Sequence, residues 1–178
     1  MILLITAACL ATIWPDVHGV RVYDHLQLPV SGFDGRPLSL PAWREHVVVI
    51  NFWSPDCAAC VAELPAFQQT YLHFETSGLS VVGVAMPYDD PALAGAAAAK
   101  THVTYPQGWD SSGRLRQVFD GIAVIPTTVV LAPGGRVVLR HEGTFTGTDL
   151  DDLVQAYLPP PNDGHDLPGT AMPLPTKR

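Results

Sequence analysis

The sequence predicts an α/β fold in which helices sandwich a central mixed sheet. Residues 47–50 and 79–86 are apolar runs rich in β-branched side chains, as is typical of buried strands, and a segment that reads as helical follows each run. Later in the chain, two apolar runs flank the turn at residues 133–135, which predicts an antiparallel hairpin. Parallel crossovers followed by an antiparallel pair make a mixed sheet with helices on its faces.

Length and charge narrow the class of protein. The chain has 178 residues, which suffice for one domain of ordinary size with tails and a sizeable core. Its formal net charge is −7, and no basic run precedes the last two residues, so nucleic acid is not an expected partner. No apolar run reaches the roughly 20 residues that a membrane-spanning helix needs.

We expect three parts along the chain. Residues 1–19 are predicted to be a leader, because residues 2–14 are apolar, uncharged and as long as the apolar region of a signal peptide. The usual basic start is missing, and a short N-terminal core strand or helix is the alternative. Residues 20–158 form the predicted folded domain, and residues 159–178 are rich in proline, as is typical of a disordered tail. We therefore expect export, with the leader cleaved, lipidated at Cys9 or kept as an anchor.

The elements at the start of the domain are short. Residues 20–28 alternate between apolar and polar side chains and suggest an edge strand. The Asp-Gly turn at residues 34–35, between apolar runs at 28–30 and 38–40, predicts an N-terminal β-hairpin. Residues 41–44 are read as a single helical turn before the first central strand.

Helix caps, turns and apolar spacing define the remaining elements. The connection that starts at Tyr105-Pro106 is read as irregular. In chain order, we expect a helix that begins at Cys57, shows its helical apolar spacing over residues 65–74 and ends before Gly78. The elements that follow are strand 79–86, helix 92–101 after the cap at Asp89-Asp90, a helix capped by residues 110–113 and running through Phe119, a strand from near Val124 to Leu131, its hairpin partner at 137–139, and a last helix from a capping box at Thr146 and Asp149 through Tyr157.

Two cysteines, Cys57 and Cys60, lie at the junction between the first central strand and the helix that follows it. Free N–H groups and the helix dipole at a helix N-terminus favour a thiolate over a thiol at Cys57. The C-x-x-C spacing places Cys60 one helical turn further on, where its sulfur can attack a mixed disulfide formed by Cys57. The pair therefore predicts thiol–disulfide exchange.

Other uses of a cysteine pair fit this sequence less well. A zinc site needs more ligands, but no second C-x-x-C or paired His follows, and the remaining cysteine is Cys9. Val61 rather than His follows Cys60, so the motif does not attach a c-type haem. Ser54 stands three residues before Cys57, but the upstream proline of the peroxidatic motif is missing. A Ser-Pro-Asp loop is also an unsuitable setting for two inert core cysteines.

Residues around the pair resemble those of a known family. Trp53, the two cysteines, Pro65 and the Ile-Pro-Thr triplet at 125–127 ahead of a hairpin resemble the thioredoxin-fold signature. The N-terminal hairpin, the Asn-Phe-Trp triplet at 51–53 and Glu63 resemble, more narrowly, the exported TlpA-like and ResA-like thiol–disulfide oxidoreductases. The resemblance covers most of the domain and implies a thioredoxin-like three-layer α/β/α sandwich with an added N-terminal β-hairpin.

The resemblance also implies a role for each site residue. Cys57 is the expected nucleophile, and Cys60 is the expected resolving thiol. Pro126 is expected to follow a cis peptide bond and to lie against the disulfide. Together with Trp53 and Ile125, whose backbone would meet an extended client segment, it forms the expected substrate-binding set. An ordinary proline at a strand start is the alternative for Pro126. No metal or other cofactor is expected.

Proton transfer points to Glu63 as a third catalytic residue. Thioredoxins carry a buried Asp six residues before the nucleophile, whereas this chain has Asn51, which takes up no proton at neutral pH. Glu63 lies three residues after Cys60, on the same helical face. A partly buried carboxyl group has a raised pKa and can exchange a proton with a thiol. A solvated Glu on an exposed face is the alternative.

Two function hypotheses remain. The first is a thiol–disulfide oxidoreductase in the periplasm, or anchored to the membrane and facing outside the cytoplasm. Its implied clients are protein thiols or disulfides, such as apocytochrome c or a copper-site assembly protein, and its implied electron donor is a DsbD-like or CcdA-like membrane protein. Asp56 and the Ala58-Ala59 pair give little help to a thiolate at Cys57, which favours a reductant. The second hypothesis is a non-catalytic C-x-x-C module or metallochaperone for Cu(I) or zinc.

Overall fold

The computed structural model describes residues 30–159 of the chain. The predicted leader at 1–19, the alternating segment at 20–28 and residues 160–178 of the predicted tail lie outside the described residues. Within the described range, each helix falls short of the length or apolar character that crossing a bilayer requires.

A seven-stranded mixed sheet forms the middle of the molecule, in the order β2-β1-β5-β4-β3-β6-β7. β3 pairs in parallel with β4 and antiparallel with β6, while β4 pairs in parallel with β5 and β6 pairs antiparallel with β7. The strands are β1 (Val30–Gly32), β2 (Pro37–Leu38), β3 (Val47–Trp53), β4 (Leu79–Ala85), β5 (Gln107–Trp109), β6 (Thr127–Ala132) and β7 (Arg136–Glu142).

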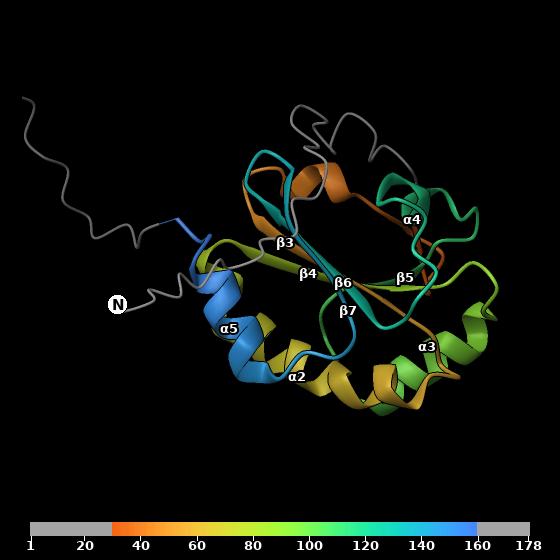
Figure 1. The fold of residues 1–178 in the computed structure, drawn as a ribbon. Coiled ribbons are helices and arrows are strands. Elements are labelled where there is room, and N and C mark those ends of the chain that lie inside the picture. The colour runs from red at the N-terminus through yellow and green to blue at the C-terminus, as the bar shows by residue number, and fades with distance from the viewer. Residues whose placement is uncertain (1–29, 160–178) are drawn as a thin grey trace, which may run out of the picture.

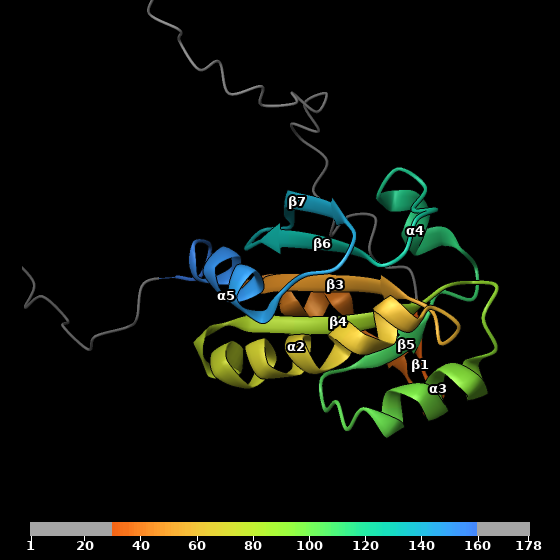
Figure 2. The same cartoon turned by 60° about the horizontal axis from the view of Figure 1, so that its bottom comes forward.

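Helices cover both faces of this sheet, as Figure 1 and Figure 2 show. α2, α3 and α5 lie on one face, whereas α4 and the 3₁₀ turn η1 lie on the other. The described helical segments are η1 (Leu40–Trp43), α2 (Ala58–Phe74), its 3₁₀ extension η2 (Glu75–Ser77), α3 (Pro91–Lys100), α4 (Arg114–Val118) and α5 (Gly147–Gln155). The predicted three-layer α/β/α sandwich is confirmed.

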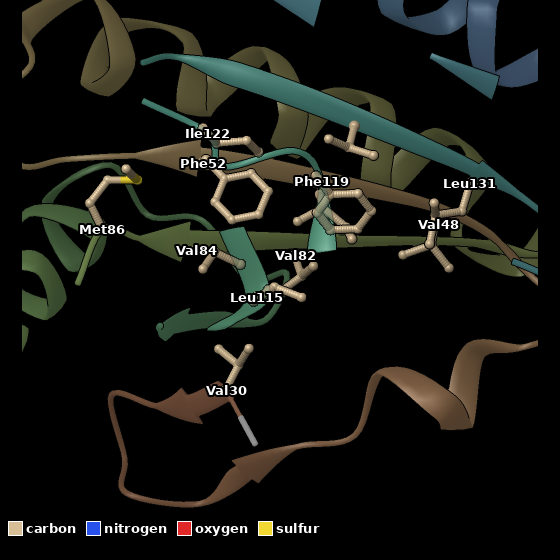
Figure 3. Close-up of a cluster of buried hydrophobic side chains, with 12 residues drawn as sticks. Val30, Val48, Phe52, Val82, Val84, Met86, Leu115, Phe119, Ile122 and Leu131 are labelled. Carbon is tan, nitrogen blue, oxygen red and sulfur yellow. The ribbon is translucent and has the colours of Figure 1, made fainter. Parts of the chain in front are cut away.

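Alternating residues of the central strand β3 supply both halves of the core. Val48 and Phe52 lie on the face of the sheet that α4 covers, and there the rings of Phe52 and Phe119 meet edge to face at 6.0 Å between centroids (Figure 3). Val47 and Val49 belong to the cluster beneath α2 and α5. Because both faces of the strand are covered, every residue of β3 is buried, which explains the unbroken apolar run in the sequence.

The predicted N-terminal hairpin is present and lies at one end of the sheet. β1 pairs antiparallel with β2, and the turn between them holds Gly35 at a φ of 80°. Asp34 Oδ1 accepts a hydrogen bond from Arg36 N at 2.9 Å. A positive φ suits glycine, which is why the Asp-Gly signal located this turn correctly. β1 also pairs with β5, which attaches the hairpin to the sheet.

The expectation of an irregular connection after Tyr105-Pro106 was wrong. Residues Gln107–Trp109 form β5, which pairs in parallel with β4 and antiparallel with β1. Three residues are too few to show a period of two in the sequence. β5 is a strand because neighbours on both sides offer partners for its backbone N–H and C=O groups.

The predicted start of β6 near Val124 was also wrong. The strand begins at Thr127, directly after a cis Ile125–Pro126 peptide bond. Pro126 has no N–H to donate to a strand ladder, so regular pairing starts at the residue that follows it.

Side-chain caps fix the starts of the helices, as predicted. Asp90 caps α3, and Thr146 caps α5 through a hydrogen bond that its Oγ1 accepts from Asp149 N at 3.3 Å. At α4, the Asp110 carboxylate accepts hydrogen bonds from the backbone N–H groups of Leu115 and Arg116. Each cap satisfies donors that the first helical turn leaves free.

Candidate active site

The cysteine pair lies where β3 ends and α2 begins. Cys57 is the N-cap of α2 in an extended conformation, with φ −96° and ψ 100°, and its N–H donates to Ser54 O at 3.2 Å. Cys57 Sγ in turn accepts a hydrogen bond from Cys60 N at 3.2 Å. A backbone donor at the sulfur and the positive end of the helix both stabilise negative charge on Cys57.

The structure shows the pair in its oxidised form, as a disulfide with 5.2 Å between the two Cα atoms. Cys60 is fully buried, whereas Cys57 is half-buried and Ala58 and Ala59 beside it are exposed. Of the two sulfurs, that of Cys57 is therefore the one another protein can reach first.

Glu63 is buried on the sheet-facing side of α2, one turn beyond Cys60, with only 5% of its surface exposed. Its Oε1 accepts a hydrogen bond from Asn51 Nδ2 at 2.8 Å, and its Oε2 accepts one from Phe145 N at 3.2 Å. The alternative of a solvated Glu on an exposed face is excluded by this burial.

Burial raises the pKa of Glu63 from 4.5 to about 7, although the hydrogen bonds from Asn51 and Phe145 lower it. Removal from water disfavours the carboxylate more than the two donors stabilise it. A carboxyl group that titrates near neutral pH can both take up and release a proton under physiological conditions, which is the requirement for acid–base work on a neighbouring thiol.

The loop that contains the cis peptide bond approaches the cysteine pair from β6. The Pro126 carbonyl accepts a hydrogen bond from Gly143 N at 2.8 Å, which ties the loop to the end of β7. Ile125 packs against the apolar cluster that contains Cys57 and Cys60. The predicted cis bond is thus present, whereas the contact of Pro126 itself with the disulfide stays a prediction.

Trp53 lies in the same cluster and is fully buried. Its neighbours there include Cys60, Leu64 and Ala85, and its Nε1 has no hydrogen-bond partner among residues 30–159. The predicted contact between Trp53 and a client stays a prediction, as do the roles of the other site residues.

Asp89 is a member of the site that the sequence did not single out. It is 8% exposed, and its carboxylate accepts hydrogen bonds from Ser54 Oγ at 2.7 Å and from Met86 N at 2.9 Å. Ser54 Oγ also accepts from Asp56 N at 3.3 Å, so Asp89 holds the loop that leads to Cys57. Burial raises the pKa of Asp89. The signal available in the sequence was the pair of adjacent carboxylates Asp89 and Asp90, ahead of a helix that starts with a proline. Only Asp90 caps that helix.

Of the two metals in the alternative hypothesis, zinc needs ligands beyond the two cysteines. In the part of the chain that the structure describes, no three or more His, Cys, Asp or Glu side chains gather as a metal-ligand set.

Fold and site together define a class of protein, a thioredoxin-fold oxidoreductase with a disulfide at the start of a helix. Residues 24–140 match the model of the AhpC/TSA family, and the chain belongs to this family.

Relatives found by sequence carry names of the same class. The thiol–disulfide oxidoreductase ResA of Bacillus subtilis (strain 168) is 26% identical over 132 residues, which cover 74% of this chain and 72% of that protein. ResA of Geobacillus thermodenitrificans (strain NG80-2) is 25% identical over 131 residues, with 73% and 74% of the two chains covered.

Solved structures agree on the fold. A thiol:disulfide interchange protein of the thioredoxin family from Chlorobium tepidum TLS superimposes with a TM-score of 0.67 and 24% identity, covering 74% of this chain and 94% of its own. A secreted disulfide oxidoreductase of Mycobacterium tuberculosis, described as homologous to E. coli DsbE, gives a TM-score of 0.67 and 20% identity, with 75% and 98% covered. These likenesses establish the thioredoxin-like fold that the sequence predicted.

Proposed function

We propose that this oxidoreductase exchanges its Cys57–Cys60 disulfide or dithiol with protein thiols outside the cytoplasm and acts there as a reductant. The observation that carries the proposal is the contrast between the two sulfurs. Half-buried Cys57 at a helix N-terminus can reach a client, whereas Cys60 is fully buried one turn from a carboxyl group, Glu63, whose pKa is about 7. The name of the ResA relatives supports the same reaction.

The first step of reduction is attack by the Cys57 thiolate on a client disulfide. A bond forms between Cys57 Sγ and one client sulfur, the client disulfide breaks, and the second client sulfur leaves as a thiolate. The Cys60 N–H that points at Cys57 Sγ and the N-terminus of α2 stabilise the attacking thiolate. The extended client segment is expected to lie along the backbone at Ile125 and Pro126.

The second step releases the client. The Glu63 carboxylate takes the proton of the Cys60 thiol, directly or through one water molecule. Cys60 Sγ then attacks Cys57 Sγ, the bond between Cys57 and the client breaks, and the client sulfur leaves as a thiolate. The products are the Cys57–Cys60 disulfide and protonated Glu63. Oxidation of a dithiol client follows the same steps in reverse.

Carboxylates near the pair support the reducing direction. Asp56 directly precedes Cys57 and is exposed. Asp89 is buried and accepts a hydrogen bond from Ser54, which lies in the same loop as Asp56. A negative charge near a thiolate raises its free energy and so stabilises the reduced form less. A strong oxidant requires the opposite, a reduced form that is much stabilised as thiolate.

We expect a reduction potential nearer to that of thioredoxin, about −270 mV, than to that of DsbA, about −120 mV. The measurement is equilibration in dithiothreitol and glutathione redox buffers, with the dithiol fraction counted by alkylation. An Asp56→Ala variant is expected to shift the potential upward. Glu75→Ala, at the other end of α2, is the matched control and is expected to leave it unchanged. A wild-type potential near that of DsbA contradicts the reducing direction.

Clients and electron supply follow from the same proposal. An exported reductant needs a dedicated donor, because its compartment is oxidising. We propose a membrane protein of the DsbD-like or CcdA-like kind as that donor, and apocytochrome c or a copper-site assembly protein as the client.

The proposed location has its own test. A C-terminally tagged protein expressed from its own start is expected in the periplasmic or membrane fraction, accessible to an impermeant thiol reagent after reduction. The control is a variant that starts at residue 20, which is expected to remain in the cytoplasm. Recovery of the full-length protein in the cytoplasmic fraction rules the location out.

A further inference from the structure

A row of polar positions crosses the sheet beneath α2. Thr128 on β6 is the cross-strand partner of Asn51, Asn51 is the partner of Gly83 on β4, and Gly83 is the partner of Gln107 on β5. Cross-strand partners point to the same face of a sheet. That face is the one under α2, because Asn51 donates its hydrogen bond to Glu63.

The missing side chain of Gly83 makes room in the middle of this row. A Cβ atom at Gly83 would lie 2.2 Å from Gln107 Oε1 and 2.6 Å from Gln107 Nε2. The Gln107 amide therefore folds over β4, the strand next to Asn51, and occupies the space that a larger residue at position 83 would fill.

The polar atoms of this row, together with the hydroxyl of Tyr105 near Gln107, are buried without enough partners. Asn51 Oδ1, Thr128 Oγ1, the Tyr105 hydroxyl and both amide atoms of Gln107 have no hydrogen-bond partner among the described residues. Asn51 and Thr128 are fully buried, and Tyr105 is 2% exposed. Leaving such buried groups unsatisfied destabilises the folded state, and sites that are both polar and buried typically hold ordered water with about three hydrogen bonds.

Tyr105 connects the row to Glu63. Burial raises the pKa of Tyr105, the charge of Glu63 raises it further, and the nearby Gln107 amide lowers it without reaching hydrogen-bond geometry. The Tyr105 phenol is thus close enough to both the Gln107 amide and the Glu63 carboxyl group to be affected by them, while the phenol and the amide have no hydrogen-bond partner among the described residues.

We propose that these atoms line an internal water site beside Glu63, and that its water relays protons between Glu63 and bulk solvent during disulfide exchange. The inference rests on the proposed proton transfer from Cys60 to Glu63. After that transfer, the water takes the proton from the Glu63 carboxyl group and passes it to solvent, and the carboxylate is restored. The relay operates behind the disulfide, so a client that covers Cys57 does not block it.

Other titratable groups near Glu63 are few in the described part of the chain. Cys60 lies on α2 itself, and Tyr105 precedes β5. His141 on β7 is reached through Phe145, whose N–H donates to Glu63 and whose ring lies 4.5 Å from the His141 ring between centroids. Because these other titratable groups lie nearby, the experiment has to follow the protonation of Glu63 itself rather than infer it from activity.

The test removes polar atoms from the water site without touching Glu63 or the cysteines. Tyr105→Phe deletes one hydroxyl, and Gln107→Leu replaces the amide with an apolar side chain of similar size. Tyr71→Phe is the matched control, because the Tyr71 ring packs edge to face against Tyr105 at 6.1 Å but is not one of the row's unpartnered groups. The full-length proteins are oxidised for the structural and titration probes, and reduced for measuring the rate of client release. The probes are a high-resolution crystal structure, water-to-protein NMR cross-relaxation and carboxyl ¹³C titration of Glu63.

We expect ordered water within hydrogen-bond distance of Asn51 Oδ1 and the Gln107 amide in the wild type. Both site variants are expected to lose it and to raise the Glu63 titration midpoint by about half a unit to one unit, because the carboxylate loses solvation. They are also expected to slow release of the client about three- to tenfold. This is small compared with the total contribution of general acid–base catalysis, which is typically about 10²–10⁴-fold. Tyr71→Phe is expected to leave the ordered water, the Glu63 titration midpoint and the rate of client release unchanged.

A dry wild-type site, with Gln107 and Asn51 bonded to each other, overturns the proposal. Bound water with an unchanged Glu63 midpoint and unchanged rate in both site variants overturns the relay. If the variants do shift the Glu63 midpoint but Glu63→Gln leaves the pH dependence of exchange intact, the proposed role of Glu63 has failed and the water site stands. If Gln107→Leu does not fold, Tyr105→Phe alone decides.

Discussion

A Cys60→Ser variant is expected to accumulate a stable mixed disulfide between Cys57 and its client, while a Cys57→Ser variant captures none. Cys57 is the half-buried sulfur at the start of α2, and Cys60 is fully buried beneath it. Without Cys60 no second sulfur can resolve the adduct, and serine in place of Cys57 is not a nucleophile at neutral pH. Both variants are therefore expected to lose catalysed disulfide exchange and to fall to the uncatalysed rate.

The measurement is mass spectrometry of non-reduced adducts, made with a model peptide disulfide and with periplasmic extract. The Cys57→Ser, Cys60→Ser double variant is the control for non-covalent capture. Equal capture through Cys60 in the Cys57→Ser protein would falsify the assignment of roles. If neither single variant forms an adduct, the proposed exchange reaction is contradicted.

The second large effect is expected at Glu63. The Glu63→Gln substitution keeps the volume and can keep both hydrogen bonds: the new amide oxygen accepts from Phe145 N, and the new amide nitrogen donates to Asn51 Oδ1 if the Asn51 amide turns over. What is lost is the proton. Exchange by the variant is expected to slow by up to about 10²-fold, with a pH–rate curve that lacks its inflection near pH 7. Superimposable curves for variant and wild type show that Glu63 is a bystander.

Glu63→Gln is expected to slow the reaction but to stabilise the folded protein above pH 7. The pKa of Glu63 is raised from 4.5 to about 7 in the folded chain, so between these values the folded state binds more protons than the unfolded state. The free energy of unfolding therefore falls as pH rises through this window, by about 3 kcal/mol in total at about 1.4 kcal/mol per unit. Glu63→Gln is expected to remove this slope and to be the more stable protein above pH 7.

Urea denaturation of the oxidised protein between pH 4.5 and 8 checks the stability effect. Glu75→Gln, an exposed substitution at the end of the same helix, serves as the control for a general effect of charge. If the wild type and Glu63→Gln show parallel stability curves across this window, burial does not perturb Glu63 as the structure indicates.

Local signals in the sequence located most of the fold. The apolar run at β3, the caps Asp90 and Thr146, and the Asp-Gly turn of the hairpin act over a few residues, so each could be read without knowing its surroundings. The strand β5 could not be read in this way. It has three residues, and it is a strand only because β4 and β1, distant in sequence, lie on either side of it.

For the site, the local sequence was enough to indicate which atoms react. C-x-x-C spacing at a strand–helix junction places two sulfurs one turn apart, and that geometry is a property of the local backbone. The reactivity of those sulfurs depends in addition on packing between segments that are distant in sequence. Glu63 has its raised pKa because α2 packs against the sheet over Asn51, and Asp89 meets Ser54 across 35 positions of sequence. Desolvation and hydrogen bonding of this kind arise only in the folded chain, and no local pattern encodes them.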